Sequence, residues 1–285
     1  VSLDAIVIAG ARIVGLSVGG GSVVATDLVV RGTRETADGT LGRGVNVRTG
    51  GQLALTRALV EDSRDVGLFA EAAGTSVEAT DVVVRGTREQ ASDGTGGRGV
   101  GVQEGAQLAL SRALVEDNRD VGLFADGLGT NVEATDVVVR GTREQASDGT
   151  IGRGIGVQEG AQLTLSRALV EDNRDVGLFV NRTGSTVEAT DVVVRRTLEQ
   201  ASDGTGGRGL SVQEGAQLAL SRALVEDNRD VGLFADGAGT SVEATDVVVR
   251  TTRERTSDGT RGRGVNVEDG AHLALSRALV EDNRE

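Results

Sequence analysis

The sequence predicts an all-β solenoid, a right-handed parallel β-helix of about ten coils with three short strands in each coil. The first reason is repetition: the motif Ala-Leu-Val-Glu-Asp returns at a step of 55 residues, with its leucine at Leu59, Leu114, Leu169, Leu224 and Leu279. The second is that short apolar segments of alternating character are separated by glycine or polar turns, as strands are. The third is composition, because 43 glycines, no tryptophan, no tyrosine and only four phenylalanines leave small branched side chains to fill thin layers.

Each 55-residue unit divides into two related halves, and we expect each half to form one coil. In one unit the first half begins at Gly99, the second half begins at Gly122, and the next unit begins at Gly154. Without the extra segment described next, these steps give 23–24 residues per coil. An extra segment of about eight residues, Gln145 to Gly152 in this unit, follows the second half and predicts a loop on every second coil. Residues 1–285 are therefore predicted to form a single β-helix domain of two-coil units, excerpted from a longer repeat protein.

Other folds fit the repeat less well. Runs such as Val137 to Val139 and the density of glycine disfavour helix. No two-residue Asn-Gly or Asp-Gly turn joins consecutive strands into a hairpin. The Leu-x-x-Leu-x-Leu-x-x-Asn frame of leucine-rich repeats is missing as well. Stacked coils, in which each strand pairs with its equivalent one coil away, satisfy all of these observations.

Three recurring features point to a known family. The halves begin with Gly-x-x-Val, they contain Leu-x-Leu segments, and an asparagine follows Ala-Leu-Val in a turn, at Asn118, Asn173, Asn228 and Asn283. In these features the whole chain resembles the right-handed parallel β-helix repeat family, which has the pectate-lyase-like architecture. The resemblance implies the fold, and we expect this chain to be a non-catalytic bacterial repeat protein of that family.

Stacking turns each aligned position into a column, and two outer columns alternate in charge at every coil. If Ala113 and Val115 point inward, the residues beside them point outward. One column then contains Arg112, Asp136, Arg167 and Asp191, and a second contains Glu116, Arg140, Glu171 and Arg195. Opposite charges on adjacent strands attract, so these structural charge ladders would fix the register of the coils. A charged face for a partner is the alternative interpretation.

Two uncharged columns allow alternative interpretations as well. The asparagines of the turn alternate with Thr87, Thr142, Thr197 and Thr252, and inward amides there would bond along the stack. The four phenylalanines recur on every second coil, at Phe69, Phe124, Phe179 and Phe234. Alignment directs them outward, so they form either an exposed interaction surface or a row covered by the loops. Residues such as Gly101 would then leave room beside each ring.

Candidate chemistry is sparse. The loops repeat Ser-Asp-Gly-Thr and offer calcium candidates at Asp93, Asp148, Asp203 and Asp258, although neither the EF-hand nor the calcium β-roll pattern is present. Glycoside hydrolysis needs paired carboxylates at one particular place, whereas breaks in the repeat are few. They are Arg182, Arg196, Leu198, Arg255, Arg261 and His272. One histidine and no cysteine cannot build a catalytic triad or a His-metal cluster. We therefore predict no enzyme, no catalytic residues and no cofactor apart from possible calcium.

Charge and composition narrow the function classes. A net charge of −13 argues against nucleic acid as a partner, and no apolar run approaches the length of a membrane span. We expect a structural or adhesive repeat segment of a secreted or cell-surface bacterial protein. Two alternatives stay open: a polysaccharide-binding or polysaccharide-degrading β-helix, and a self-assembling, fibre-forming segment. The expected partners are accordingly a second copy, stacked end to end, or a surface glycan or protein.

Overall fold

The computed structural model describes residues 1–284, which consist of strands, turns and loops. A typical coil contains one six-residue strand followed by one ten-residue strand. The six-residue strands are β3 (Val14–Gly19), β5 (Arg43–Arg48), β7 (Val66–Glu71), β9 (Arg98–Gln103), β11 (Val121–Asp126), β13 (Arg153–Gln158), β15 (Val176–Asn181), β17 (Arg208–Gln213), β19 (Val231–Asp236) and β21 (Arg263–Glu268). The ten-residue strands are β4 (Ser22–Arg31), β6 (Gln52–Glu61), β8 (Ser76–Arg85), β10 (Gln107–Glu116), β12 (Asn131–Arg140), β14 (Gln162–Glu171), β16 (Thr186–Arg195), β18 (Gln217–Glu226) and β20 (Ser241–Arg250). Four shorter strands occupy the ends: β1 (Ser2–Asp4), β2 (Val7–Ala9), β22 (His272–Ser276) and β23 (Leu279–Glu281).

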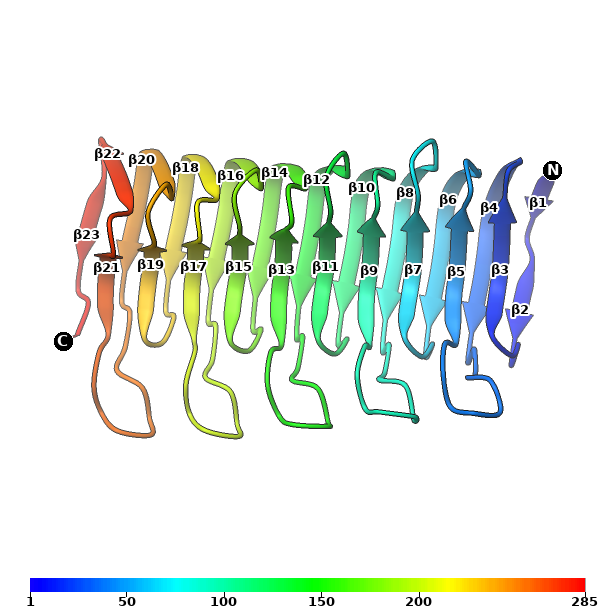
Figure 1. Ribbon diagram of the computed structural model, residues 1–285, viewed down its shortest axis with the longest axis horizontal. Coiled ribbons are helices and arrows are strands. Elements are labelled where there is room, and N and C mark those ends of the chain that lie inside the picture. Colours follow the sequence, from blue (N-terminus) through cyan, green and yellow to red (C-terminus); the bar gives the residue numbers. More distant parts are fainter. Residues whose placement is uncertain (285) are drawn as a thin grey trace.

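The strands form two parallel sheets that run the length of a rod (Figure 1). The nine ten-residue strands and the four end strands make a 13-stranded sheet, in which the long strands pair with their equivalents in the neighbouring coils. The short strands make a 10-stranded sheet in the same order along the axis. The register is the one that the alignment of halves predicts: Leu110 lies opposite Ala134, and Glu116 lies opposite Arg140. The prediction of a right-handed parallel β-helix is confirmed.

The number of strands per coil differs from the expected three. Two of the predicted strand segments are joined into one long strand with a bend, because Arg112 and Asp136 take φ values of 49° and 55° without ending the ladder. Such a left-handed residue turns the strand sharply while the hydrogen bonds resume on either side. The alternation of side chains is shifted at the bend, so both Leu110 and Ala113 point into the core. We call these positions, Asp27, Arg57, Asp81, Arg112, Asp136, Arg167, Asp191, Arg222, Asp246 and Arg277, the bend.

The core is a continuous stack of valine, leucine, isoleucine and alanine between the two sheets. Glycine is required where the backbone of the next coil comes closest. A Cβ atom on Gly122 would lie 2.7 Å from the carbonyl oxygen of Gly154 and 2.6 Å from Val139 Cγ1. Real Cβ atoms do not approach backbone so closely, which explains why glycine recurs at this position of every coil.

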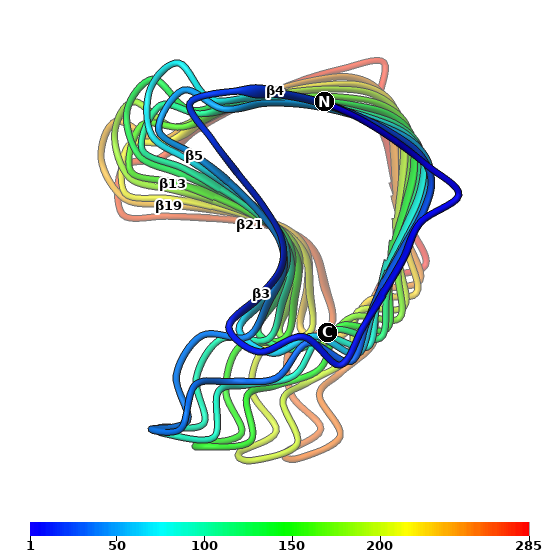
Figure 2. The same cartoon turned by 90° about the vertical axis from the view of Figure 1, so that its right-hand side faces the viewer.

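The outer shape sets where a partner could approach. Viewed along the axis, the 10-stranded sheet curves inward, so that its outer face is concave (Figure 2). Loops project from one edge of the rod on alternate coils, as the extra segment predicts (Figure 1). No helix in residues 1–284 is long and apolar enough to cross a membrane.

Candidate functional site

The most elaborate side-chain cluster lies at the turn that leads from a first-type coil into the next short strand. We call this turn the elbow, and it occurs four times, at Asp65, Asp120, Asp175 and Asp230. At the second elbow, Asp120 Oδ2 accepts a hydrogen bond of 2.8 Å from Arg98 Nε. Its Oδ1 accepts one of 2.8 Å from Gln145 Nε2, which belongs to the loop. The Asp120 side chain is 2 % exposed, so this ion pair lies largely out of water.

Each elbow arginine covers a phenylalanine ring. The guanidinium carbon of Arg98 lies 4.1 Å from the ring centre of Phe124, and the equivalent distances at the other three elbows are 3.8–4.0 Å. At the first elbow, the ring of Phe69 also packs against a glycine of the following coil. It fills the space beside Gly101, since a Cβ atom on Gly101 would lie 3.2 Å from the ring. These contacts combine a cation–π interaction with close packing.

The exposed row of phenylalanines that the alignment allowed is therefore corrected. Phe69, Phe124, Phe179 and Phe234 are 2–7 % exposed. The rings do lie on the outer face of the 10-stranded sheet, but the guanidinium covers them, the aspartate holds the guanidinium, and the loop glutamine holds the aspartate. Sequence periodicity could not show this because Arg98 and Phe124 occupy non-equivalent positions in their coils, since Phe124 lies opposite Gly101.

The loops bond to one another along the rod. Glu89 Oε1 accepts a hydrogen bond of 2.8 Å from the amide of Ala146, which lies one unit further along. Glu144 and Glu199 make the same contact with the amides of Ala201 and Thr256, at 2.7 Å each. The loops thus form a continuous outer layer with the period of the unit.

The calcium candidates serve these loops internally. Asp93 Oδ1 accepts hydrogen bonds of 2.9 Å from both the amide and the hydroxyl of Thr95, and Asp148, Asp203 and Asp258 do the same with the threonine two residues on. The hydrogen bond from the threonine backbone amide is the main reason why the pKa of each carboxyl group is lowered. No group of three or more acidic, histidine or cysteine side chains suited to a metal occurs within residues 1–284. A calcium site at these aspartates has no support in this geometry.

The charge ladders pair their members unevenly. In the bend, Arg112 Nε lies 2.6 Å from Asp81 and Arg167 Nε lies 2.6 Å from Asp136, so each arginine selects the aspartate of the preceding coil. In the second ladder, Arg140 and Arg195 lie 2.7 and 2.9 Å from Glu116 and Glu171 of the preceding coil. The two ladders act at alternate coil interfaces, and Asp191 continues the first with Arg222 at 2.6 Å.

Hydrogen bonding keeps both partners charged in the bend. The pKa of Asp81, Asp136 and Asp191 is lowered, mainly by the hydrogen bond from the arginine of the following coil. The pKa of Arg112, Arg167 and Arg222 is raised by the reciprocal contact. These directions lead away from neutrality, whereas a general acid or base needs a pKa moved toward the working pH.

Inside the rod, the predicted amide column bonds along the stack. Asn118 Oδ1 accepts a hydrogen bond of 3.0 Å from the amide of Thr87, and its Nδ2 donates one of 3.3 Å to the carbonyl of Val84. The same pair of contacts recurs at Asn173, Asn228 and Asn283. The first unit has Ser63 at this position, and its hydroxyl is buried without a hydrogen-bond partner.

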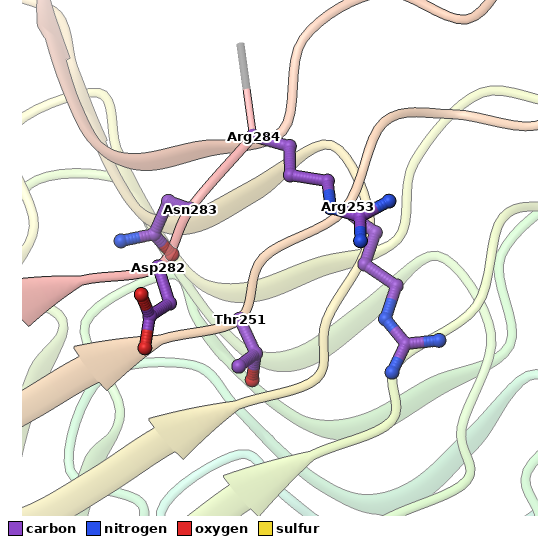
Figure 3. A pocket seen from close by; sticks show the side chains of 5 residues that line it. All are labelled: Thr251, Arg253, Asp282, Asn283 and Arg284. Carbon is purple, nitrogen blue, oxygen red and sulfur yellow. The ribbon is translucent and has the colours of Figure 1, made fainter.

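The surface depressions repeat with the units. Figure 3 shows one at the last coil, lined by Thr251, Arg253, Asp282, Asn283 and Arg284. Three units earlier, a depression lined by Gly86, Arg88, Asp117 and Arg119 among others occupies the equivalent place. Arg253 Nη2 lies 3.1 Å from Asp227, so a carboxylate neutralises part of this charge. His272, the single histidine, stands exposed in β22 opposite Ser241.

The sequence did not single out the elbow pairs, although their members were visible. Arg98 belongs to the recurring Arg-Gly motif, and Asp120 belongs to the recurring acidic turn. Both repeat at the step of the unit, which was the available signal. Their separation of 22 residues becomes a contact only because one coil brings the chain back on itself.

Comparison with known proteins agrees with this architecture. No protein-family model matches the chain, and no curated protein sequence does. Among solved structures, the A-module of the Azotobacter vinelandii mannuronan C-5 epimerase AlgE6 superposes with a TM-score of 0.62 at 13 % identity, covering 98 % of this chain and 81 % of that one. Pectate lyase Pel9A gives a TM-score of 0.58 at 13 % identity, covering 91 % of this chain and 70 % of that one. The chain shares the parallel β-helix fold of these proteins.

Proposed function

We propose that this chain is a non-catalytic structural rod, a spacer or adhesive segment of a secreted or cell-surface protein. One observation carries the proposal: the charged pairs repeat from unit to unit, and each aspartate of the bend and the elbow has an arginine partner in the neighbouring coil. The bend pairs recur five times at 2.5–2.7 Å, and the elbow pairs recur four times at 2.8–3.3 Å. Catalysis needs one place at which groups are left available to a substrate.

The fold suits a spacer mechanically. Strands in register bond to both neighbours over the whole length, and roughly ten coils at about 4.8 Å give a rod of about 50 Å. Solenoids are stabilised by contacts between neighbouring repeats, so length can be varied by adding units.

Polysaccharide binding is the second candidate, and the concave face of the 10-stranded sheet supports it. A column of amide and carboxylate side chains lies at the ends of the short strands. Within it, Gln158 Nε2 donates a hydrogen bond of 3.1 Å to Asp126 Oδ1. Two solved structures that share this fold are, by name, a pectate lyase and a mannuronan epimerase. Their low identity supports the fold alone, so the candidate rests on the shape and polarity of this face.

Both candidates are separated by one experiment. The purified chain is incubated with pectate, mannuronan and a neutral glucan, and reducing ends, unsaturated products and epimer content are measured alongside binding. A structural rod gives no product with any polymer, and X-ray scattering gives an elongated particle. Binding without turnover would favour the second candidate. Turnover that is abolished by substituting a single carboxylate would overturn the proposal.

A further inference from the structure

The fourth elbow differs in charge from the other three. The first three have a loop glutamine beside the aspartate, as Gln145 stands beside Asp120. The fourth has Arg255 in the place of that glutamine and Arg261 in the place of Ile151. The fold brings both replacements to the same buried carboxylate.

Three guanidinium groups share Asp230, whose side chain is 1 % exposed. Arg208 Nε lies 3.3 Å from its Oδ2, and Arg261 Nη1 lies 3.3 Å from its Oδ1. Arg255 Nε lies 3.9 Å from the same Oδ1, which is an ion-pair distance but too long for a hydrogen bond. By contrast, the second elbow places one arginine and one neutral amide at 2.8 Å each.

The local charges do not balance. Arg255 Nη2 lies 2.6 Å from Asp258 Oδ2, so the three arginines contact two aspartates directly, whereas the second elbow has Arg98 with Asp120 and Asp148. The pKa of Asp203 in the preceding loop is lowered mainly by its hydrogen bonds with Thr205 and to a lesser extent by the charge of Arg255. Arg255 Nε is buried and has no acceptor within residues 1–284. A buried charged donor without an acceptor is costly, and such groups normally have a partner.

We propose that the fourth elbow binds a small oxyanion between Arg208, Arg255 and Arg261. Guanidinium groups present donors in a planar fork that matches sulfate, phosphate and carboxylate, which share this chemistry. The Arg261 side chain is 40 % exposed, so the site opens to solvent on that side. An anion that enters beside the exposed Arg261 offsets the positive charge of the three arginines. Its contact with Arg255 Nε requires a small movement of that side chain, because the atom is buried.

The other elbows are not expected to bind. A glutamine amide donates a neutral hydrogen bond, and the residue in the place of Arg261 is Gly96, Ile151 or Gly206. The repeats thus provide internal controls, because the same backbone carries either set of side chains.

The test is a calorimetric titration of the chain with sodium sulfate, sodium phosphate and sodium acetate in turn. Sodium chloride holds the ionic strength constant. We expect one anion to bind per chain. Binding of acetate without binding of sulfate or phosphate would point to a carboxylate ligand. The double variant Arg255→Gln with Arg261→Gly gives the fourth elbow the side chains of the third, which has Gln200 and Gly206. It should weaken anion binding by about tenfold or more. Gln145→Arg with Ile151→Arg should create a second site.

Circular dichroism checks that each variant keeps the fold, and Arg255→Gln alone serves if the double variant does not fold. Equal affinity of the native chain and the folded variant would overturn the proposal. Absence of heat with all three anions, supported by unchanged Arg255 Nε–H signals in NMR spectra, would overturn it as well.

Discussion

The bend and the elbow use the same chemistry in different surroundings. In the bend, Arg112 and Asp81 approach to 2.6 Å while their side chains stay 58 % and 40 % exposed. At the elbow, Arg98 and Asp120 approach to 2.8 Å while the aspartate is 2 % exposed. Exposed pairs compete with water and contribute little, whereas a buried charge that loses its partner costs several kcal/mol. The comparison teaches that the bend specifies register and the elbow holds the loop, the arginine and the phenylalanine together.

The largest effect is expected from breaking an elbow. Asp120→Ala leaves the half-buried Arg98 guanidinium over Phe124 without its carboxylate and frees the loop glutamine Gln145. We expect a loss of about 3 kcal/mol, at the low end for a buried pair because the arginine keeps partial access to water, seen as a lower midpoint in urea unfolding and as faster amide exchange in the loop. The matched control in the bend, Asp136→Ala, should lower the midpoint far less. Equal effects of the two substitutions would contradict the comparison.

The internal column should come next. Asn118→Ala removes the acceptor for the Thr87 amide and the donor for the Val84 carbonyl, which are buried. The expected loss is about 2–3 kcal/mol, measured by the same unfolding experiment. Asn131→Ala, at a partly exposed position on the outer face, is the control and should change little.

A gain is expected where the first unit departs from the column. Ser63 and Thr33 have buried hydroxyl groups without partners, and Ser63→Asn places an amide within reach of the Thr33 amide and the Val30 carbonyl. We expect stabilisation by about 1 kcal/mol, with slower amide exchange at Thr33. Ser63→Ala should be neutral because the serine hydroxyl makes no hydrogen bond. Loss of stability in Ser63→Asn would show that the first unit lacks the space that the other units have.

The smallest effect at neutral pH concerns the bend, and acid should reduce it further. The pKa of Asp81 and Asp136 is lowered in the folded chain, mainly by the hydrogen bonds from Arg112 and Arg167. Their contribution to stability is therefore complete above the unfolded-state pKa of about 3.9 and is lost as pH falls through the lower folded value. We expect Asp81→Asn to change the unfolding midpoint less at pH 2 than at pH 7. NMR titration of the carboxyl carbons checks the direction, and a raised pKa would contradict it.

Much of the fold could be predicted from the sequence because the repeat is local information. The step of 55 residues, the division into halves and the opposition of Glu116 and Arg140 all follow from alignment. The asparagine column followed too, because Asn118 recurs in step with the threonine column. The bend did not follow, since nothing in the residue types of Arg112 and Asp136 requires a positive φ. A covered Phe124 was one of the two alternatives that the alignment left open, but its cover by Arg98 did not follow, because that residue lies 26 positions earlier at a non-equivalent place in its coil.

The sequence by itself therefore determined the architecture, the register and the charge alternation of this protein. These depend on side chains at equivalent positions, and stacking makes equivalence in sequence the same as adjacency in space. Only the tertiary structure decided which charges are buried, which arginine selects which aspartate, and where positive charge is left over at Asp230. The physical reason is that burial and pairing depend on how far the chain turns between strands, and this fixes which non-equivalent residues meet.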